Sequence, residues 1–173
     1  MNIAKTKISG IYEIENRQFS DNRELFVKTF HAKTFKQYGL NDDFKESFYS
    51  VSQKGVLRGM HFQLPPRDHD KLVYVVQGEI LDVALDIRSG SDTYGEYYST
   101  TISSQNCRCL YLAKGIAHGF LTLSETATVI YSTTTEYSHS HDTGIRWDSF
   151  GFEWPKMDYI ISDRDLNFEK FLR

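Results

Sequence analysis

Cysteine is scarce in this sequence, because the chain of 173 residues has only Cys107 and Cys109. Side chains two residues apart on a strand share a face, where they are poorly placed for a disulfide with each other. Zinc needs four ligands, and no second Cys or His pair stands at a matching spacing. We therefore predict two reduced packing thiols. The absence of a charged-then-apolar leader predicts a cytoplasmic location.

Long apolar runs and an excess of basic charge are missing as well, and proline is scarce. The longest apolar run is far below the roughly 20 residues of a membrane-spanning helix, so no membrane partner is expected. Twenty Lys and Arg residues against 23 Asp and Glu residues give a net charge of −3, which argues against a general nucleic-acid coat. With three prolines and no repeat or low-complexity linker, the sequence predicts a single domain over residues 1–173.

Aromatic residues, in contrast, make up 14% of the chain, and short apolar or alternating runs recur between turn residues. Aromatic and β-branched side chains fit pleated sheets, and many short strands indicate an all-β sandwich or barrel. The expected strands lie in the runs IYEI, LFVKTF, FKESFYSVS, GVLRGMHF, KLVYVVQG, EILDVALDI, EYYSTTIS, CRCLYLA, HGFLTLS and TATVIYSTTTEYS. Short helices are expected over residues 31–40 and 164–173.

Two histidines stand in strand-like surroundings, His61 in RGMHFQL and His118 in GIAHGFL. A histidine on a strand is more often a hydrogen-bonded core residue than a catalytic group. The residues around each histidine therefore have to indicate which of the two roles applies. Arg58 would face away from His61 on a regular strand, but Gly59 between them permits a bulge that aims both inward. Together with Lys71 on the next run, these side chains would form a polar pocket in a barrel mouth.

Three long runs carry a specific pattern over nearly the whole chain. They are GVLRGMHFQLPPRDHDKLVYVVQGEILDVALDIRSGSDTYGEY, LYLAKGIAHGFLTLSETATVIYSTTTEY and GIRWDSFGFEWP, and a final ISDRD follows. In this order and with few gaps, the sequence resembles the dTDP-4-dehydrorhamnose 3,5-epimerase family. The resemblance implies a jelly-roll cupin fold and a homodimer that exchanges N-terminal strands. It also implies a nucleotide-linked 4-keto-6-deoxy sugar as substrate, and no cofactor.

The resemblance implies catalytic residues too. In a 4-keto sugar, C3 and C5 are both α to the carbonyl, so each can be inverted by removing a proton from one face and returning one to the other. His61 matches the family's base in the LRGxHFQ motif, and Asp165 matches its acidic partner in the SxxD motif. Lys71 matches the cation beside the C4 oxygen, and Tyr137 matches the acid on the opposite face.

Six further positions match the family's substrate contacts, namely Phe19, Arg23, Lys28, Arg58, Gln63 and His118. The planar fork of arginine suits a diphosphate, which favours that role for Arg23 and Arg58. Phe19 corresponds to an aromatic residue near the partner subunit's nucleotide. For Asp82 and Asp86, which share one face of a strand, hydrogen bonding is the expected role, because an unpaired buried carboxylate is costly.

No metal is expected. Metal-binding cupins place an HxH pair on this strand, and Gly59 stands where the first histidine would be, so only His61 and His118 are left of a ligand set. His139 and His141 do form an HSH pair. In a polar loop without a clear third ligand, they are expected to be solvated.

The chain departs from the family pattern at nucleotide- and sugar-contacting positions. Glu24 and Lys28 replace a glycine and a glutamate, and Glu46 and Phe48 replace a glutamine and an asparagine. These changes alter donor and acceptor matching, so the base stays open among thymine, cytosine and guanine. Inversion at C3, at C5 or at both also stays open. The alternatives are a 3,4-ketoisomerase and a non-catalytic sugar-binding cupin.

Overall fold

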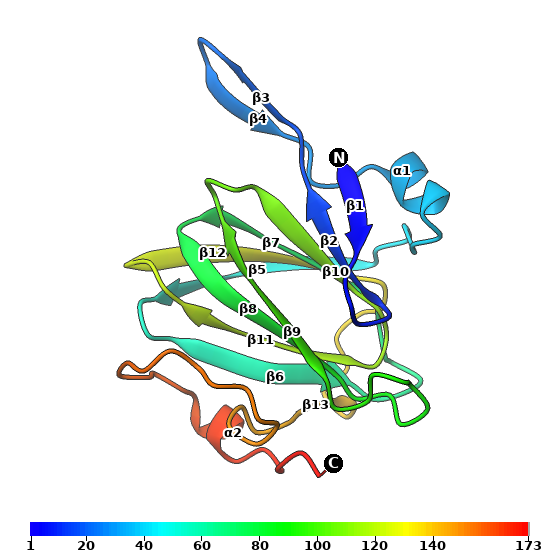
Figure 1. Ribbon diagram of the computed structural model, residues 1–173, viewed down its shortest axis with the longest axis vertical. Coiled ribbons are helices and arrows are strands. Elements are labelled where there is room, and N and C mark those ends of the chain that lie inside the picture. Colours follow the sequence, from blue (N-terminus) through cyan, green and yellow to red (C-terminus); the bar gives the residue numbers. More distant parts are fainter. Residues whose placement is uncertain (173) are drawn as a thin grey trace.

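Two antiparallel sheets pack face to face in the computed structural model, which describes residues 1–172 (Figure 1). The six-stranded sheet has the order β1 (Asn2–Lys5), β2 (Ile11–Glu15), β10 (Arg108–Leu112), β7 (Lys71–Gln77), β12 (Thr126–Thr133) and β5 (Glu46–Gln53). The five-stranded sheet has the order β13 (Asp142–Gly144), β6 (Leu57–Gln63), β11 (Ile116–Thr122), β8 (Glu79–Asp86) and β9 (Tyr97–Ser103). This architecture confirms the predicted all-β, cupin-type jelly-roll sandwich.

Alternation along the strands directs side chains to two different clusters. On β8, Ile80 and Ala84 pack between the sheets, whereas Val83 and Leu85 belong to a cluster on the outer face of the five-stranded sheet. Successive side chains of a strand point to opposite faces, so β8 is buried on both sides. The same alternation places the even-numbered positions of β8 in the interior of the sandwich, where the polar cavity lies.

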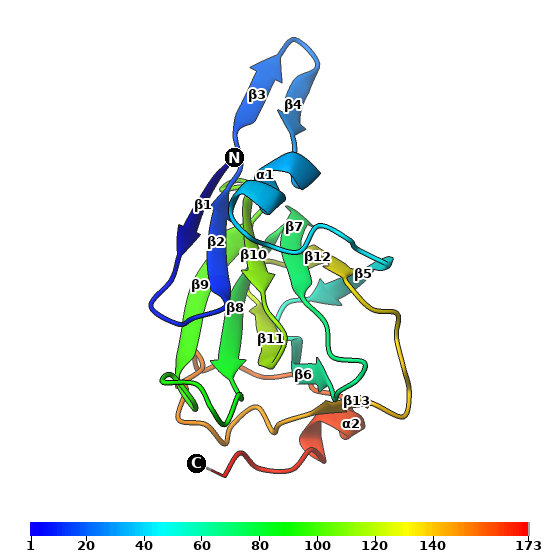
Figure 2. The ribbon, with the colours of Figure 1, turned by 90° about the vertical axis from the view of Figure 1, so that its right-hand side faces the viewer.

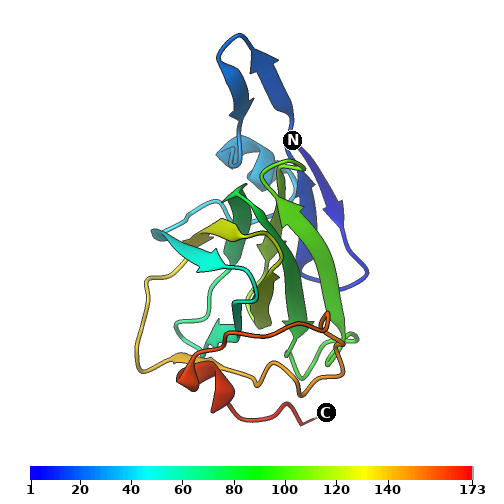
Figure 3. The same ribbon diagram turned by 90° about the vertical axis from the view of Figure 1, so that its left-hand side faces the viewer.

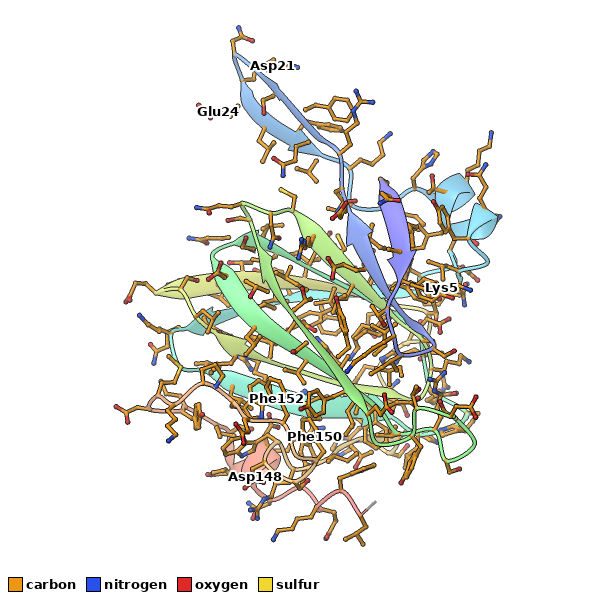
Figure 4. The ribbon with its side chains drawn as sticks, viewed as in Figure 1. Lys5, Asp21, Glu24, Asp148, Phe150 and Phe152 are labelled. Carbon is orange, nitrogen blue, oxygen red and sulfur yellow. The ribbon has the colours of Figure 1, made fainter. Side chains whose placement is uncertain are left out.

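Non-strand segments cover the outer faces of both sheets. Helix α1 (Ala32–Gln37) lies against the six-stranded sheet, where Phe35 meets Tyr111 edge-on with ring centroids 5.9 Å apart (Figure 2). The chain after β13 runs along the five-stranded sheet and ends beside it (Figure 3). Phe150 and Phe152 of this segment lie against that sheet (Figure 4). These outer layers cover much of the five-stranded sheet and the α1 side of the six-stranded sheet, whereas Tyr49 and Val51 on β5 stay exposed.

The bulge that Gly59 permits in β6 is present. Two residue steps on β11, from His118 to Phe120, face three on β6, from His61 to Arg58. Gly59 has a φ of +129°, and a Cβ there would lie 2.5 Å from the Cα of Gly119. Only glycine fits this position, and the extra residue lets Arg58 and His61 both line the cavity between the sheets.

A two-stranded hairpin, β3 (Gln18–Asp21) and β4 (Glu24–Val27), projects from one end of the sandwich (Figures 1 and 4). Its apolar side chains are unusually open, with Phe19 48% and Phe26 61% exposed. Exposed aromatic residues gathered on one element are typical of a surface that another molecule covers.

The predicted C-terminal helix is only partly correct. Helix α2 spans Asp163–Leu166, and the predicted continuation to residue 173 is wrong for the part that the structure describes. Tertiary hydrogen bonds replace helical ones there, because the carbonyl of Glu169 accepts from Arg146 N and the N–H of Phe171 donates to Ser149 Oγ. The predicted helix over residues 31–40 is confirmed in its central part by α1.

Both cysteines are free thiols and buried, as predicted. Burial raises the pKa of the Cys109 thiol to about 12, so it is protonated and unreactive at neutral pH. In residues 1–172, the helices are too short and too polar to cross a bilayer.

Asp86, at the end of β8, accepts hydrogen bonds from the side chains of Arg88, Ser91 and Thr93, which confirms its predicted role. Burial alone would raise the pKa of this carboxyl, but these donors outweigh burial and lower the pKa to about 2. We expect Asp86→Asn to lower the free energy of unfolding at pH 7 by about 2 kcal/mol, since one pKa unit corresponds to about 1.4 kcal/mol.

The pH dependence follows from the lowered pKa. The contribution of Asp86 is fully present above about pH 4 and is lost as the pH falls toward 2, when the folded carboxyl takes up its proton. Urea unfolding at pH 7 and thermal unfolding from pH 5 to 2 measure the stability difference between the wild type and Asp86→Asn. Asp92→Asn, in the same loop but exposed, is the control. Equal stability of the two variants at pH 7 would contradict the prediction.

Candidate functional site

A cavity of about 240 Å³ lies between the two sheets. Its walls come from β5, β7 and β12 of one sheet, from β6 and β11 of the other, and from the segments before β13 and at α2. The lining residues are Glu46, Phe48, Ser50, Arg58, His61, Phe62, Gln63, His69, Lys71, His118, Gly119, Phe120, Tyr131, Thr133, Tyr137, Asp142 and Arg164. The cavity thus brings together most of the side chains that the sequence singled out.

His61 is held by Asp165, as the sequence predicts. The ring Nε2 lies 2.8 Å from Asp165 Oδ1, while Asp165 Oδ2 accepts the backbone N–H of Gly59 at 3.0 Å. Ser162 caps α2 by accepting the N–H of Asp165, which fixes the carboxylate at the start of the helix. Burial opposes ionisation, but the hydrogen bond with His61 and the other donors hold the pKa of Asp165 below its usual value.

This pairing fixes the form of the His61 ring. An ionised carboxylate only accepts hydrogen bonds, so the neutral ring carries its proton on Nε2 and keeps the Nδ1 lone pair free. Phe168 packs edge-on against the ring with centroids 5.7 Å apart and restricts its rotation. The His61 ring is therefore held in a fixed orientation on the wall of the cavity.

A second histidine–carboxylate pair lies deeper. His118 Nε2 is 2.7 Å from Asp82 Oδ2, and both side chains are almost fully buried. Burial lowers the pKa of His118 despite the nearby Asp82, so the ring is neutral at pH 7. The hydrogen-bonding role expected for Asp82 is confirmed, and the placement of His118 in the pocket agrees with the sequence.

Lys71 begins β7 and lines the same cavity. Burial lowers the pKa of its ammonium group to about 8, while the carboxylates of Asp82 and Asp142 act in the opposite direction. The side chain is consequently a cation at pH 7, and its charge lies in the cavity between the two sheets. A cation in such surroundings interacts strongly with any anion that forms beside it.

Tyr137 lies at the rim, in the polar segment between β12 and β13, and its side chain is 57% exposed. Its hydroxyl is 3.4 Å from His139 Nδ1, a long contact. Its backbone N–H donates to Glu46 Oε2 at 2.6 Å. The phenol therefore borders both solvent and cavity, which is where a group that exchanges protons with water would stand.

The predicted substrate contacts separate into two groups. Arg58 lines the cavity and donates from Nε to Ser52 Oγ, and Gln63 and His118 also line it. Phe19, on the hairpin, does not line the cavity, nor does Lys28, which follows the hairpin.

Arg23, in the hairpin turn, pairs with Asp21 at 2.5 Å, and its side chain is 83% exposed. It does not line the cavity either, so one chain alone does not unite the two groups.

Tyr131 and Arg164 line the cavity but escaped the sequence interpretation, whereas Phe48 lies at a substrate-contacting position, as the family pattern implies. The ring of Phe48 stacks on that of Tyr131 with centroids 4.9 Å apart, which makes an aromatic wall on the β5 side. Arg164, next to the motif aspartate, forms a 2.7 Å ion pair with Asp142. The position of Arg164 beside Asp165 in SDRD was the one signal that could have indicated it.

Metal-ligating side chains are dispersed. Within residues 1–172, no group of three or more His, Cys, Asp and Glu side chains is arranged to hold a metal ion. His139 is exposed, and His141 contacts Ser138 and Ser140 through its Nδ1.

The proteins that this chain resembles in sequence and structure, reported below, are sugar epimerases. The family model described as dTDP-4-dehydrorhamnose 3,5-epimerase matches residues 5–172. A curated dTDP-4-dehydrorhamnose 3,5-epimerase of Shigella flexneri is 41% identical over 175 residues, covering 99% of this chain and 97% of the relative.

Two solved structures extend the comparison. A dTDP-6-deoxy-D-glucose-3,5-epimerase from Legionella pneumophila, in complex with dTDP-4-keto-L-rhamnose, is 36% identical with a TM-score of 0.94, over 98% of this chain and 92% of that chain. A 3′-monoepimerase from Streptomyces bikiniensis in complex with dTDP-quinovose is 28% identical with a TM-score of 0.92, over 96% of this chain and 86% of that chain. The same fold thus serves enzymes named for two inversions and for one.

Proposed function

This chain belongs to the dTDP-4-dehydrorhamnose 3,5-epimerase family, and on that basis we propose that it inverts C3, C5 or both of a nucleotide-linked 4-keto-6-deoxy sugar. The observation that carries the proposal is one cavity lined by His61, Lys71 and Tyr137, in which Asp165 holds the His61 ring from behind the wall. A base, a cation and a phenol are the groups that a proton transfer next to a carbonyl requires. A protein that only binds sugars has no need of this combination.

The proposed reaction has two proton transfers. His61 Nδ1 takes the proton from C3 or C5, and the electron pair of the broken C–H bond forms an enolate with its charge on the C4 oxygen. Lys71 stabilises that oxygen. Tyr137 gives its phenolic proton to the other face of the same carbon, and the exposed phenolate that results takes a proton from water. Asp165 keeps the imidazolium ring of His61 oriented until the ring releases the proton it has taken to solvent.

Substrate binding involves a second copy of the chain in this proposal. Arg58 holds the diphosphate from within the cavity, and the hairpin of a partner copy delivers Phe19, Arg23 and Lys28, which are remote from the cavity in one chain. The exposed aromatic residues of the hairpin support a homodimer, because such a surface is normally covered. The two buried free thiols are compatible with a cytoplasmic enzyme.

The chain departs from the family pattern at positions that contact the nucleotide, so the nucleotide is the part of the substrate that these departures affect. The relatives are named for dTDP sugars, which favours thymine. Glu46 and Phe48 line the cavity, where they alter the donors and acceptors available to a ligand. For this reason CDP- and GDP-linked sugars belong in the same test as the dTDP-linked one.

Incubation in D₂O with dTDP-, CDP- and GDP-linked 4-keto-6-deoxyglucose, followed by NMR, tests the proposal. We expect deuterium at C3, C5 or both, together with inverted stereochemistry at the labelled carbon, for at least one nucleotide. A product with the carbonyl at C3 would instead identify a 3,4-ketoisomerase. Tight binding without isotope exchange for all three would identify a binding protein and overturn the proposal.

A further inference from the structure

The segment that carries Tyr137 is anchored to both sheets by two side-chain oxygens. The N–H of Tyr137 donates to Glu46 Oε2 at 2.6 Å, and the next N–H, that of Ser138, donates to Gln63 Oε1 at 2.6 Å. Glu46 is the first residue of β5, in the six-stranded sheet, and Gln63 is the last residue of β6, in the five-stranded sheet. Two consecutive backbone groups are thus clamped between the walls of the cavity.

The amide of Gln63 is fully engaged by the protein. Its Nε2 donates to the carbonyl of Arg67 at 2.8 Å and approaches that of Glu136 at 3.3 Å, while Oε1 holds Ser138. The side chain is 5% exposed. These bonds link the loop after β6 to the Tyr137 segment, so Gln63 acts on the rim of the cavity through the backbone.

The ring of Tyr137 has little else to fix it. Its side chain is more than half exposed, and its hydroxyl has only the long contact with His139. The position of the phenol therefore depends on the position of its backbone, which Glu46 and Gln63 set. A displacement of about 1 Å at a reacting group can cost on the order of 100-fold in rate.

We propose that Glu46 and Gln63 are positioning residues, which hold the Tyr137 phenol over the reacting carbon by binding two consecutive backbone N–H groups. This inference rests on the proposed function, in which Tyr137 returns the proton. Removal of a proton by His61 does not use the phenol, whereas inversion does. Loss of the hydrogen bond from Glu46 or Gln63 should therefore lower the rate of inversion and leave the rate of solvent exchange nearly unchanged.

The test compares Glu46→Ala with Glu46→Gln, which keeps an acceptor oxygen at the same reach. Deuterium in recovered substrate and inverted product are measured in D₂O by NMR at early times. Because Glu46 also lines the cavity, both rates are measured at saturating substrate, where a change in binding does not affect them. For Glu46→Ala, exchange into substrate should then stay within about twofold of the wild-type rate while inversion falls about 10- to 100-fold. Glu46→Gln should restore both rates. Glu136→Ala, an exposed glutamate beside Tyr137, is the matched control and should behave as wild type.

The outcomes separate this inference from the proposed function. If wild-type protein neither exchanges nor inverts, the proposed function fails. If wild type is active and Glu46→Ala loses exchange and inversion together, or loses neither, the positioning role is overturned. If Glu46→Ala does not fold, Glu46→Asp, one methylene shorter, carries the same test, because its shorter reach weakens the anchor. Gln63→Leu, which removes the hydrogen bonds of this amide with Arg67, Glu136 and Ser138, is expected to raise the ratio of exchange to inversion, as Glu46→Ala does.

Discussion

Replacing His61 by alanine is expected to lower the rate of epimerisation by about 10²- to 10⁴-fold, the range usual for loss of a general base. The physical reason is that the proton on C3 or C5 loses its acceptor, because His69, which also lines the cavity, has its Nδ1 engaged by Gln63 and Thr135. The neighbouring imidazole, that of His118, is tied to Asp82 through its Nε2 and lies deeper between the sheets. Deuterium wash-in from D₂O should fall by the same factor as product formation, because the first proton transfer is lost.

Two comparisons make this result specific. Asp165→Asn leaves the imidazole in place but removes the charge that orients it, so exchange should fall by less than in His61→Ala. His31→Ala, an exposed histidine at the start of α1, should keep the wild-type rate. Binding of the nucleotide sugar, measured by calorimetry, should persist in His61→Ala. Wild-type exchange by His61→Ala would remove His61 from the reaction.

The sandwich itself was predictable because its evidence is local. Strands such as Lys71–Gln77 and Glu79–Asp86 are indicated by apolar runs between turn residues. The large number of such short strands predicts a sandwich of two sheets. The bulge was also predictable, since Gly59 sits between two side chains that must share a face. At the C-terminus, local pattern failed, because bonds from Arg146 and Ser149 decide where α2 ends.

The site was predictable only in part, because its pairings join residues distant in sequence. The His61–Asp165 contact spans 104 residues and was expected from motif resemblance, whereas periodicity alone indicates neither partner. The contact between Glu46 and Tyr137 spans 91 residues and depends on the placement of a loop without regular structure. Propensity carries no information on such contacts, so Glu46 stood out only as an unusual residue in its motif.

Lys71 offers a prediction in which charge and pH act together. The enolate oxygen gains a negative charge only as the C–H bond breaks, so a fixed cation beside it stabilises the transition state more than the substrate. Burial lowers the pKa of Lys71 to about 8, with Asp82 and Asp142 opposing. The cationic form therefore predominates below pH 8 and declines above it, within a range where most lysines stay charged.

Lys71→Met, which keeps the unbranched stem of the side chain but not its ammonium group, should lower kcat/KM by about 10²- to 10³-fold at pH 7. In the wild type, kcat/KM should fall as the pH rises through about 8, because deprotonation of Lys71 removes the same charge. The variant, with no ammonium group to lose, should lack this alkaline limb. Profiles from pH 6 to 10 for both proteins, with exposed Lys156→Met as the control, measure the effect. A limb that survives in Lys71→Met would assign the titration to another group, and a loss below about threefold would show that the C4 oxygen draws its stabilisation from elsewhere.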